Sequence, residues 1–317
     1  MSTDDVAIRV KELVKIFPGP DGGQLRAVDG ISFDVHTGEK FGFLGPNGAG
    51  KTTTLEMIEG IKPPTSGSAT VLGFDIVESA ARLKPLIGVQ LQSANFFKEL
   101  QLKELLELFG SFYGLKVDAV ALLKEVGLDE KALAKVSDIS GGQKRRFSIA
   151  ASLVNDPEVL FLDEPTSGLD PQARRLLWEL VEQVSASGKT IVLTTHYMDE
   201  AEALCDRVAV IDNGKIVALD TPLALIQSLD SAYHYRFLTS APVPTARLES
   251  LPGARQLTSK PAGGLTRYDL AVRDSAESLG EFDSVMKRAG VKMIDFRIEP
   301  STLEDVFLVL TGKELRD

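Results

Sequence analysis

Residues 45–52, Gly-Pro-Asn-Gly-Ala-Gly-Lys-Thr, have the residue types and spacing of a phosphate-binding loop. Glycines at these positions let the backbone wrap closely, so that successive N–H groups point at a β-phosphate. Lys51 would supply a point charge to the β- and γ-phosphates, and the Thr52 hydroxyl could bind Mg²⁺. The predicted nucleotide-binding residues of this segment are Gly45, Pro46, Asn47, Gly48, Ala49, Gly50, Lys51, Thr52 and Thr53.

A pair of acidic residues, Asp163 and Glu164, follows the apolar run at residues 159–162. Polar residues at the carboxyl end of a parallel strand lie where open α/β sheets bind ligands. We expect Asp163 to hold Mg²⁺, directly or through water, opposite Thr52. Glu164 could then orient and deprotonate an attacking water, which is the role of a general base. This pair therefore indicates hydrolysis rather than transfer to a small acceptor.

A second glycine-containing segment, Ser140-Gly141-Gly142-Gln143, stands directly before a helical pattern. Apolar residues recur after it at positions i, i+3, i+4 and i+7, counted from Phe147. A helix that begins here has an N-terminus able to face phosphate, with a serine hydroxyl to contact it. One compact domain hardly needs two such anion sites around one nucleotide. Two copies of the chain would need them if the second site closes over the partner's nucleotide.

These segments require strands and helices that position them. From residue 40 to about residue 215, short apolar runs alternate with helical patterns, which predicts an α/β fold. The residues before position 40 read as β-strands, and the turn-forming cluster at residues 18–23 predicts a hairpin loop between them. The apolar runs that we expect to be strands are residues 41–44, 159–162, 190–193 and 207–211.

The chain changes character near residue 230. Alternating patterns at residues 233–237 and 268–272 predict two strands, and helical patterns follow at residues 276–289 and 302–311. We therefore predict a nucleotide-binding domain over residues 1–228 and a small α+β domain over residues 229–317.

Composition limits the function further. The chain has 317 residues, which at roughly 150 residues per domain favours two domains. Its 35 basic and 45 acidic residues give a net charge of −10, which argues against a nucleic-acid partner. No apolar run approaches the roughly 18 residues of a membrane-spanning helix. A single cysteine, Cys205, fits a reducing compartment, so we expect a soluble, cytosolic protein.

Taken in order, these motifs resemble those of the ATP-binding cassette (ABC) ATPases over about the first 225 residues. The same order includes a glutamine loop at residues 88–92, a loop at residues 167–170 and a switch histidine, His196. The resemblance implies a P-loop NTPase with a RecA-like core, an antiparallel β subdomain and a helical subdomain. It also implies a head-to-tail dimer that holds two ATPs, each between one chain's phosphate loop and the other chain's signature, Ser140–Gln143.

The resemblance also implies roles for single residues. His196 resembles the residue that contacts the γ-phosphate and positions the general base and water. Gln92 resembles the glutamine that meets Mg²⁺ and water, with Gln90 as the alternative. Asp170 would lie at the dimer interface, and Phe17 either stacks on adenine or packs in the core. The implied catalytic set is Lys51, Gln92, Glu164 and His196, and the implied Mg²⁺ set is Thr52, Gln92 and Asp163.

Residues 88–92, 195–202 and 299–312 resemble the daunorubicin-resistance type of exporter ATPase. That resemblance implies a separate ABC type 2 integral membrane permease, which exports a drug, lipid or glycan. It implies a homodimer, or a pairing with a second ATP-binding subunit, at the cytoplasmic face of a bacterial or archaeal membrane. The surface around Gln92, Phe96 and Phe97 would face the permease, although the two aromatics could equally belong to the core.

The alternative is a non-transport ABC ATPase that works in DNA repair or on the ribosome. The DNA-repair class usually inserts a long coiled coil between the phosphate loop and the signature. Lys51 and Ser140 are 140 − 51 = 89 positions apart, with no sustained heptads between them. The ribosome class usually carries two cassettes in one chain, whereas each motif occurs once here. An exporter subunit is therefore the favoured interpretation.

Overall fold

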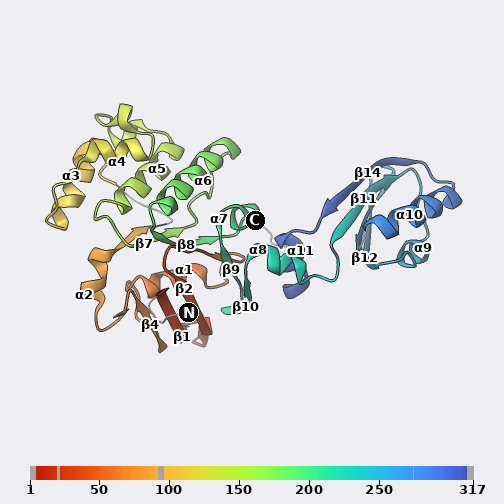
Figure 1. Ribbon diagram of the computed structural model, residues 1–317, viewed down its shortest axis with the longest axis horizontal. Helices are drawn as coiled ribbons and strands as arrows, with labels where there is room; N and C mark the ends of the chain where they lie inside the picture. The colour runs from red at the N-terminus through yellow and green to blue at the C-terminus, as the bar shows by residue number, and fades with distance from the viewer. Residues whose placement is uncertain (1–4, 20–21, 92–95, 274, 313–317) are drawn as a thin grey trace. The chain divides into compact units, whose positions relative to one another are not determined.

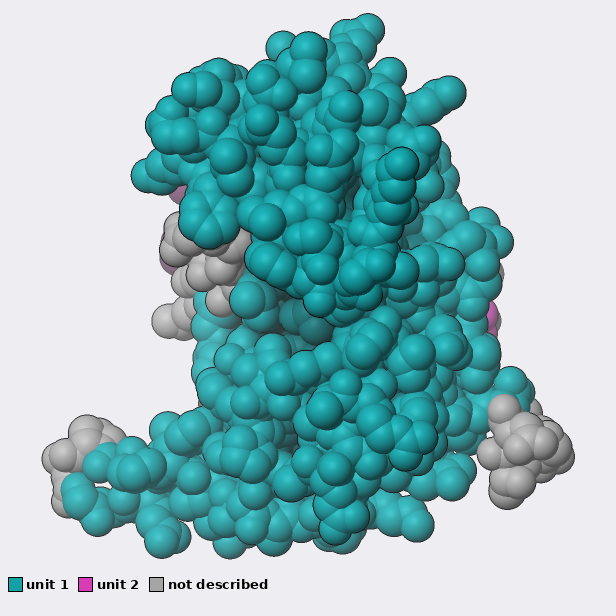
Figure 2. Space-filling model, turned by 90° about the vertical axis from the view of Figure 1, so that its left-hand side faces the viewer, with its two compact units in different colours: residues 1–222, 315–317 teal, residues 223–314 magenta. Residues whose placement is uncertain are grey.

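The computed structural model describes residues 5–19, 22–91, 96–273 and 275–312. The described residues form two compact units, unit 1 ending at Pro222 and unit 2 beginning at Leu223 (Figure 1). Figure 2 shows mainly the surface of unit 1. The predicted boundary, between residues 228 and 229, falls just after helix α8 (Pro222–Gln227). Among the described helices, none has both the length and the apolar character needed to cross a lipid bilayer.

Unit 1 begins with an antiparallel sheet of four strands in the order β2-β1-β4-β5. The long strands β1 (Val6–Pro18) and β2 (Gln24–His36) pair from one end to the other, so the predicted hairpin is present. The remaining strands are β4 (Ser66–Val71) and β5 (Phe74–Asp75).

A six-stranded sheet in the order β10-β9-β3-β8-β7-β6 forms the centre of unit 1. All neighbours pair in parallel except β10 with β9. Strands buried on both faces read as continuous apolar runs, which is why four of them could be predicted from the sequence. The strands are β3 (Lys40–Leu44), β6 (Ile87–Gln90), β7 (Val159–Asp163), β8 (Thr190–Thr195), β9 (Arg207–Asp212) and β10 (Lys215–Asp220).

The register of this sheet aligns the carboxyl ends of three strands. Leu44 of β3 lies beside Thr195 of β8, and Asp163 of β7 lies beside Thr194 of β8. The residues that follow these strands therefore start from one edge of the sheet, where open α/β sheets bind ligands.

Three helices of unit 1 form a group of their own, which reaches the central sheet through the last of the three. Helices α3 (Leu102–Phe112), α4 (Ala119–Glu125) and α5 (Gly141–Ser152) pack against one another, and Figure 1 shows them on the side away from the antiparallel sheet. Unit 1 thus contains the three predicted parts, which are a parallel core, an antiparallel β part and a helical part. Its other helices are α1 (Lys51–Ile58), α2 (Ala80–Leu83), α6 (Pro171–Ala186) and α7 (Met198–Leu204).

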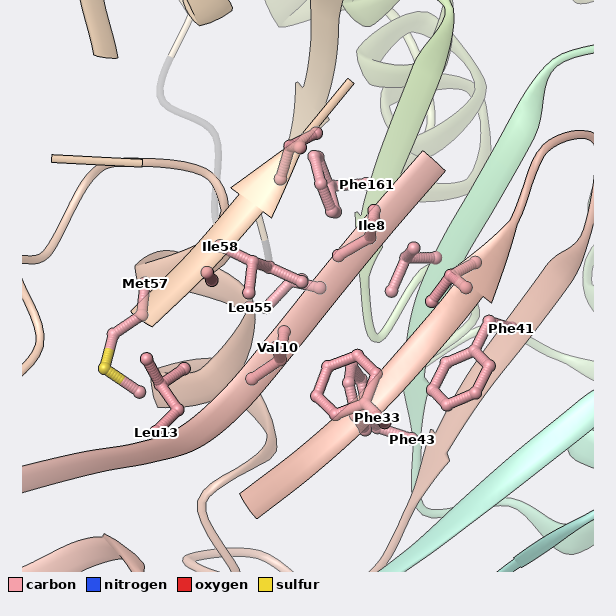
Figure 3. Close-up of a cluster of buried hydrophobic side chains, with 14 of the residues drawn as sticks. Ile8, Val10, Leu13, Phe33, Phe41, Phe43, Leu55, Met57, Ile58 and Phe161 are labelled. Atoms are coloured by element: carbon pink, nitrogen blue, oxygen red, sulfur yellow. The ribbon is translucent and has the colours of Figure 1, made fainter. Parts of the chain in front are cut away.

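The main core of unit 1 lies between the two sheets and includes α1 (Figure 3). The ring of Phe33 on β2 lies 5.4 Å from that of Phe41 and 5.2 Å from that of Phe43, both on β3. Leu55 and Ile58 bring α1 into the same cluster. Each such buried side chain contributes about 1.5–3 kcal/mol of transfer free energy, so the position of α1 is firmly set.

Unit 2 is a small α+β fold with an antiparallel sheet in the order β12-β13-β11-β14. Its core is formed by one face of the sheet, with Tyr235, Phe237 and Tyr268, and by Phe282 of the longest helix. The strands are β11 (Tyr233–Thr239), β12 (Ala254–Ala262), β13 (Leu265–Val272) and β14 (Met293–Pro300). The helices are α8, which begins at the boundary, α9 (Thr245–Glu249), α10 (Ser275–Ala289) and α11 (Leu303–Thr311).

One buried acid in unit 1 has unusual surroundings. Glu59 directly follows α1 and is only 2% exposed. Neither of its carboxylate oxygens accepts a hydrogen bond from the residues that the structure describes. Burial, reinforced by the negative charges of Asp163 and Glu56, raises the pKa of Glu59 to about 8. Glu59 is therefore protonated in the folded protein at neutral pH.

The raised pKa of Glu59 predicts that the stability of the protein depends on pH. Between pH 4.5 and about 8 the folded protein keeps a proton that the unfolded chain releases, so the free energy of unfolding falls as pH rises. Glu59→Gln removes that loss, which amounts to as much as about 5 kcal/mol. Its melting temperature should exceed that of the wild type at pH 9 and approach it below pH 4.5, with exposed Glu130→Gln as the control. Parallel pH profiles for Glu59→Gln and wild type would contradict this account.

Candidate active site

The predicted phosphate loop connects β3 to α1 and has little freedom in its backbone. Gly50 has a φ of +107°, and a Cβ atom there would lie 2.3 Å from the carbonyl oxygen of Ala27. A Cβ atom on Gly45 would lie 2.2 Å from the carbonyl oxygen of Ile211. Glycine is therefore required at both positions, and the loop is held at the N-terminus of α1, where anions are favoured.

Lys51 is buried at the base of this loop. Its Nζ donates hydrogen bonds to the carbonyl oxygens of Gly45 at 2.7 Å and Pro46 at 3.1 Å. The same Nζ lies 3.5 Å from Oε1 of Glu164. Burial lowers the pKa of Lys51, while the negative charge of Glu164 opposes the shift. The ammonium group thus lies between the loop and the acidic pair.

Asp163, the last residue of β7, is hydrogen-bonded to both α1 and β8. Its Oδ1 accepts hydrogen bonds from the hydroxyl of Thr52 at 3.1 Å and from the hydroxyl of Thr194 at 2.5 Å. Burial raises the pKa of Asp163, and both hydroxyls oppose that shift by stabilising the ionised carboxylate. No sequence motif indicated a role for Thr194, which lies near the end of β8, two residues before His196.

Glu164 and His196 meet at the same edge of the sheet. Oε1 of Glu164 lies 3.4 Å from Nδ1 of His196, and both side chains are largely buried. That Nδ1 has no hydrogen-bond partner among the described residues. The structure therefore brings together Lys51, Glu164 and His196. Lys51 and His196 are more than 140 positions apart in the sequence.

The surroundings of Thr52 and Asp163 fit a magnesium ion. A hydroxyl and a carboxylate are hard oxygen donors of the kind that Mg²⁺ prefers, and here they adjoin each other. Within the described ranges there is no group of three or more His, Cys, Asp or Glu that could hold a metal. Such a sparse protein contribution is usual for Mg²⁺, which keeps several waters and binds substrate phosphates.

The two candidate glutamines are Gln90 and Gln92. Gln92 lies outside the described residues. Gln90 ends β6 and is buried, and its Nε2 donates to the carbonyl oxygen of Leu91 at 2.5 Å. Its Oε1 accepts no hydrogen bond from the described part of the chain. Gln90 is thus turned into the protein interior.

The signature segment starts α5 and closes its first turn. The Ser140 hydroxyl accepts from the backbone N–H of Gln143 at 3.2 Å, and the Gln143 side chain accepts from the backbone N–H of Ser140 at 2.8 Å. Ser140 and Gly141 are exposed. Helix α5 packs on α3, α4 and β6, whereas α1 packs on β2, β4, β7 and β8. One chain therefore carries its phosphate loop and its signature on different sets of elements.

Asp170 and Phe17 are the other residues predicted to contact nucleotide or partner. The carboxylate of Asp170 caps α6 by accepting from the N–H groups of Gln172 and Ala173, each at 3.0 Å, and it is exposed. Phe17 is half-buried near the end of β1, with the ammonium groups of Lys15 and Lys62 at 5.4 and 5.7 Å from its ring centre.

The adjacent aromatics, Phe96 and Phe97, are placed differently from each other. Phe96 packs edge-on against Phe147 of α5, with their ring centres 5.0 Å apart. Phe97 is 63% exposed. Phe96 therefore belongs to the packing of the helical part, and Phe97 is available to a partner.

A strand–loop–helix phosphate site beside buried acids and a histidine defines a P-loop nucleoside triphosphatase. Residues 28–167 match the family described as ABC transporter. The chain is 42% identical over 303 residues to Nod factor export ATP-binding protein I of Ralstonia nicotianae, covering 93% of this chain and 92% of that protein. It is 41% identical over 317 residues to the protein of that name from Rhizobium meliloti, covering 98% and 90%. The chain therefore belongs to the ATP-binding subunits of ABC transporters, and it is an ATPase.

Solved structures agree with this assignment. A dimeric ATP-binding cassette in a post-hydrolysis state, bound to ADP and Pi, is similar with a TM-score of 0.62 and 25% identity. It covers 68% of this chain and 98% of its own. A subunit of an ABC transporter complex from Clostridium perfringens gives a TM-score of 0.62 and 29% identity, covering 71% and 92%. The predicted fold class, an ABC cassette, is confirmed.

The position of Thr194 leads to a prediction. Thr194→Val removes the donor to Asp163 and the hydroxyl that accepts the backbone N–H of Glu164 at 3.0 Å. The variant should lose about 1–3 kcal/mol of stability and at least about tenfold in kcat, with KM for ATP little changed. Steady-state ATPase assays and thermal melts would measure both.

Thr190→Val on the same strand is the matched control. Its buried hydroxyl accepts from the backbone N–H of Gly38 at 2.9 Å, at the other end of β8. It should destabilise the protein to a similar degree while keeping kcat. Wild-type turnover in Thr194→Val would show that this hydroxyl does not organise the acidic pair.

Proposed function

We propose that this chain powers export across a cell membrane by hydrolysing ATP for a separate permease. The observation that carries the proposal is the convergence of Lys51, Glu164 and His196 at one buried edge of the sheet. Two relatives at 41% and 42% identity bear the name Nod factor export ATP-binding protein I, which supports export over repair or ribosome work.

In the proposed reaction, the N–H groups of the loop and the N-terminus of α1 bind the phosphates of ATP. Lys51 turns from the carbonyl groups that it now contacts toward the β- and γ-phosphates. Glu164 accepts a proton from the attacking water, and His196 holds that water and the γ-phosphate in line. Thr52 and Asp163 would hold Mg²⁺, with Gln92 as a further ligand, and the ion would neutralise developing charge on the phosphates.

The second half of each site would come from another copy of the chain. Ser140 and Gly141 are exposed at the N-terminus of α5, where a partner's phosphate could bind. Asp170 is exposed as well, at the start of α6. These positions support a head-to-tail homodimer, or a pairing with a similar second subunit, that encloses two ATPs. Phe17 would stack on the adenine of each.

The membrane partner in this proposal is an ABC type 2 permease, with the chain bound at the cytoplasmic face of the membrane. Phe97 offers an exposed aromatic contact for it, beside the predicted glutamine loop. The permease would select the cargo, and the names of the relatives suggest Nod factor or a similar compound. Residues 229–317 would act as an accessory domain that supports dimerisation or assembly with the permease.

Glu164→Gln tests the assigned base. Glutamine keeps the shape of the side chain but cannot accept the proton, so turnover should fall by about 10²-fold or more while ATP binding persists. Size-exclusion chromatography with ATP should then show a trapped dimer. Glu158→Gln, an exposed acid next to the opposite end of β7, serves as the control and should turn over normally. Undiminished hydrolysis by Glu164→Gln would rule out this base.

Removal of unit 2 tests the accessory role. A chain ending at residue 228 should still bind and hydrolyse ATP, because the phosphate loop, acidic pair and signature all lie in unit 1. Export in cells that carry the truncated chain should fall severalfold through weaker dimerisation or permease assembly. Full export by the truncated chain would eliminate this role for residues 229–317.

A further inference from the structure

Glu164 is held in a conformation that non-glycine residues rarely adopt. Its φ is +45°, in the left-handed region, where the side chain crowds the backbone. Such a conformation persists only when its surroundings over-determine it, and it is often found at active sites. The groups that hold the Glu164 backbone therefore determine where its carboxylate lies.

Among the residues that the structure describes, three hydrogen bonds hold that backbone. The N–H of Glu164 donates to the hydroxyl of Thr194 at 3.0 Å. Its carbonyl oxygen accepts from the N–H of Ser167 at 3.2 Å, in the turn that follows β7. The same oxygen accepts from the guanidinium of Arg145 at 2.8 Å. Two of these contacts come from β8 and from the chain's own turn, but the third comes from α5, the helix that the signature begins.

Arg145 also lies in a charged environment that suits this contact. Burial lowers the pKa of Arg145, and the carboxylates of Asp163, Glu164 and Glu200 oppose the shift. A guanidinium stays protonated under these conditions and presents its donors in a rigid planar fork. Its position among acids therefore supplies both a directed hydrogen bond and compensating positive charge.

The neighbouring arginine on the same helix does something else. Arg146 donates to the carbonyl oxygens of Val126 at 2.9 Å and Gly127 at 3.1 Å, just after α4. Arg146 thus ties α5 to the helical part, whereas Arg145 ties α5 to the end of β7. Two adjacent residues of one type link the signature helix to two different parts of unit 1.

We propose that Arg145 is a positioning residue for hydrolysis, which holds the strained backbone of Glu164 and links it to the signature helix. This inference rests on the proposed role of Glu164 as the base. Arg145 lies about one and a half helical turns from Ser140, so a short rigid segment of α5 joins the backbone of Glu164 to the start of the signature helix.

Arg145→Gln and Arg145→Lys test the proposal in the full-length chain. Both should lower kcat by about tenfold or more, because a misplaced base is costly, while KM for ATP stays within about twofold. Lysine keeps the charge but not the planar fork, so it should rescue little. ATP-driven dimerisation should persist, because residues 140–143 are unchanged. In Arg145→Ala, guanidinium ion added far below unfolding concentrations should restore part of the lost kcat.

Arg146→Gln is the matched control, with an expected fall in melting temperature and near-normal kcat well below that temperature. Wild-type kcat in Arg145→Gln would overturn the proposal, as would a loss of activity that follows only from a lower melting temperature. Full wild-type kcat in Arg145→Lys would also overturn the proposal, because it would show that the positive charge alone is sufficient. Glu164→Gln assayed in parallel distinguishes the two proposals. Normal turnover in that variant would show that Glu164 is not the general base, whatever the result for Arg145.

Discussion

The parallel alignment of β3, β7 and β8 is the constraint on which the rest of the site depends. Because their carboxyl ends lie in register, the phosphate loop, the acidic pair and His196 leave the sheet at one edge. The Thr194 hydroxyl then connects them, since it donates to Asp163 and accepts from the backbone of Glu164. A shift of one residue in this pairing would separate the loop lysine from the acids.

The site also concentrates charge where water is scarce. Lys51, Asp163 and Glu164 are each no more than 5% exposed, so each depends on the others for compensation. Triphosphate brings further negative charge, which one ammonium and one helix N-terminus offset only in part. A divalent cation and a second helix N-terminus, from the exposed signature of another copy, would complete the compensation. The same electrostatic demand would thus connect the proposed magnesium site and the proposed dimer with the guanidinium of Arg145, which lies among the same acids.

Local sequence patterns predicted most of the residues of the site. The residues that were not predicted act through contacts between distant parts of the chain. The loop glycines, the acidic pair and the signature could be read directly because each motif is contiguous. Thr194 and Arg145 could not, because their roles arise from hydrogen bonds between elements that only the fold brings together. In unit 2, β12 and β14 were not predicted, since both are largely exposed and lack a buried alternating face.

We propose above all that each ATP is hydrolysed between the phosphate loop of one copy and the signature of another. ATP turnover by a one-to-one mixture of Lys51→Ala and Gly141→Asp tests it most directly. A Cβ atom on Gly141 would meet nothing within 4 Å, so aspartate should fold normally yet repel a partner's phosphates. Each variant alone should be inactive, and the mixture should regain turnover through mixed dimers with one intact site. A mixture as inactive as its components, or full activity of Gly141→Asp alone, would contradict the claim.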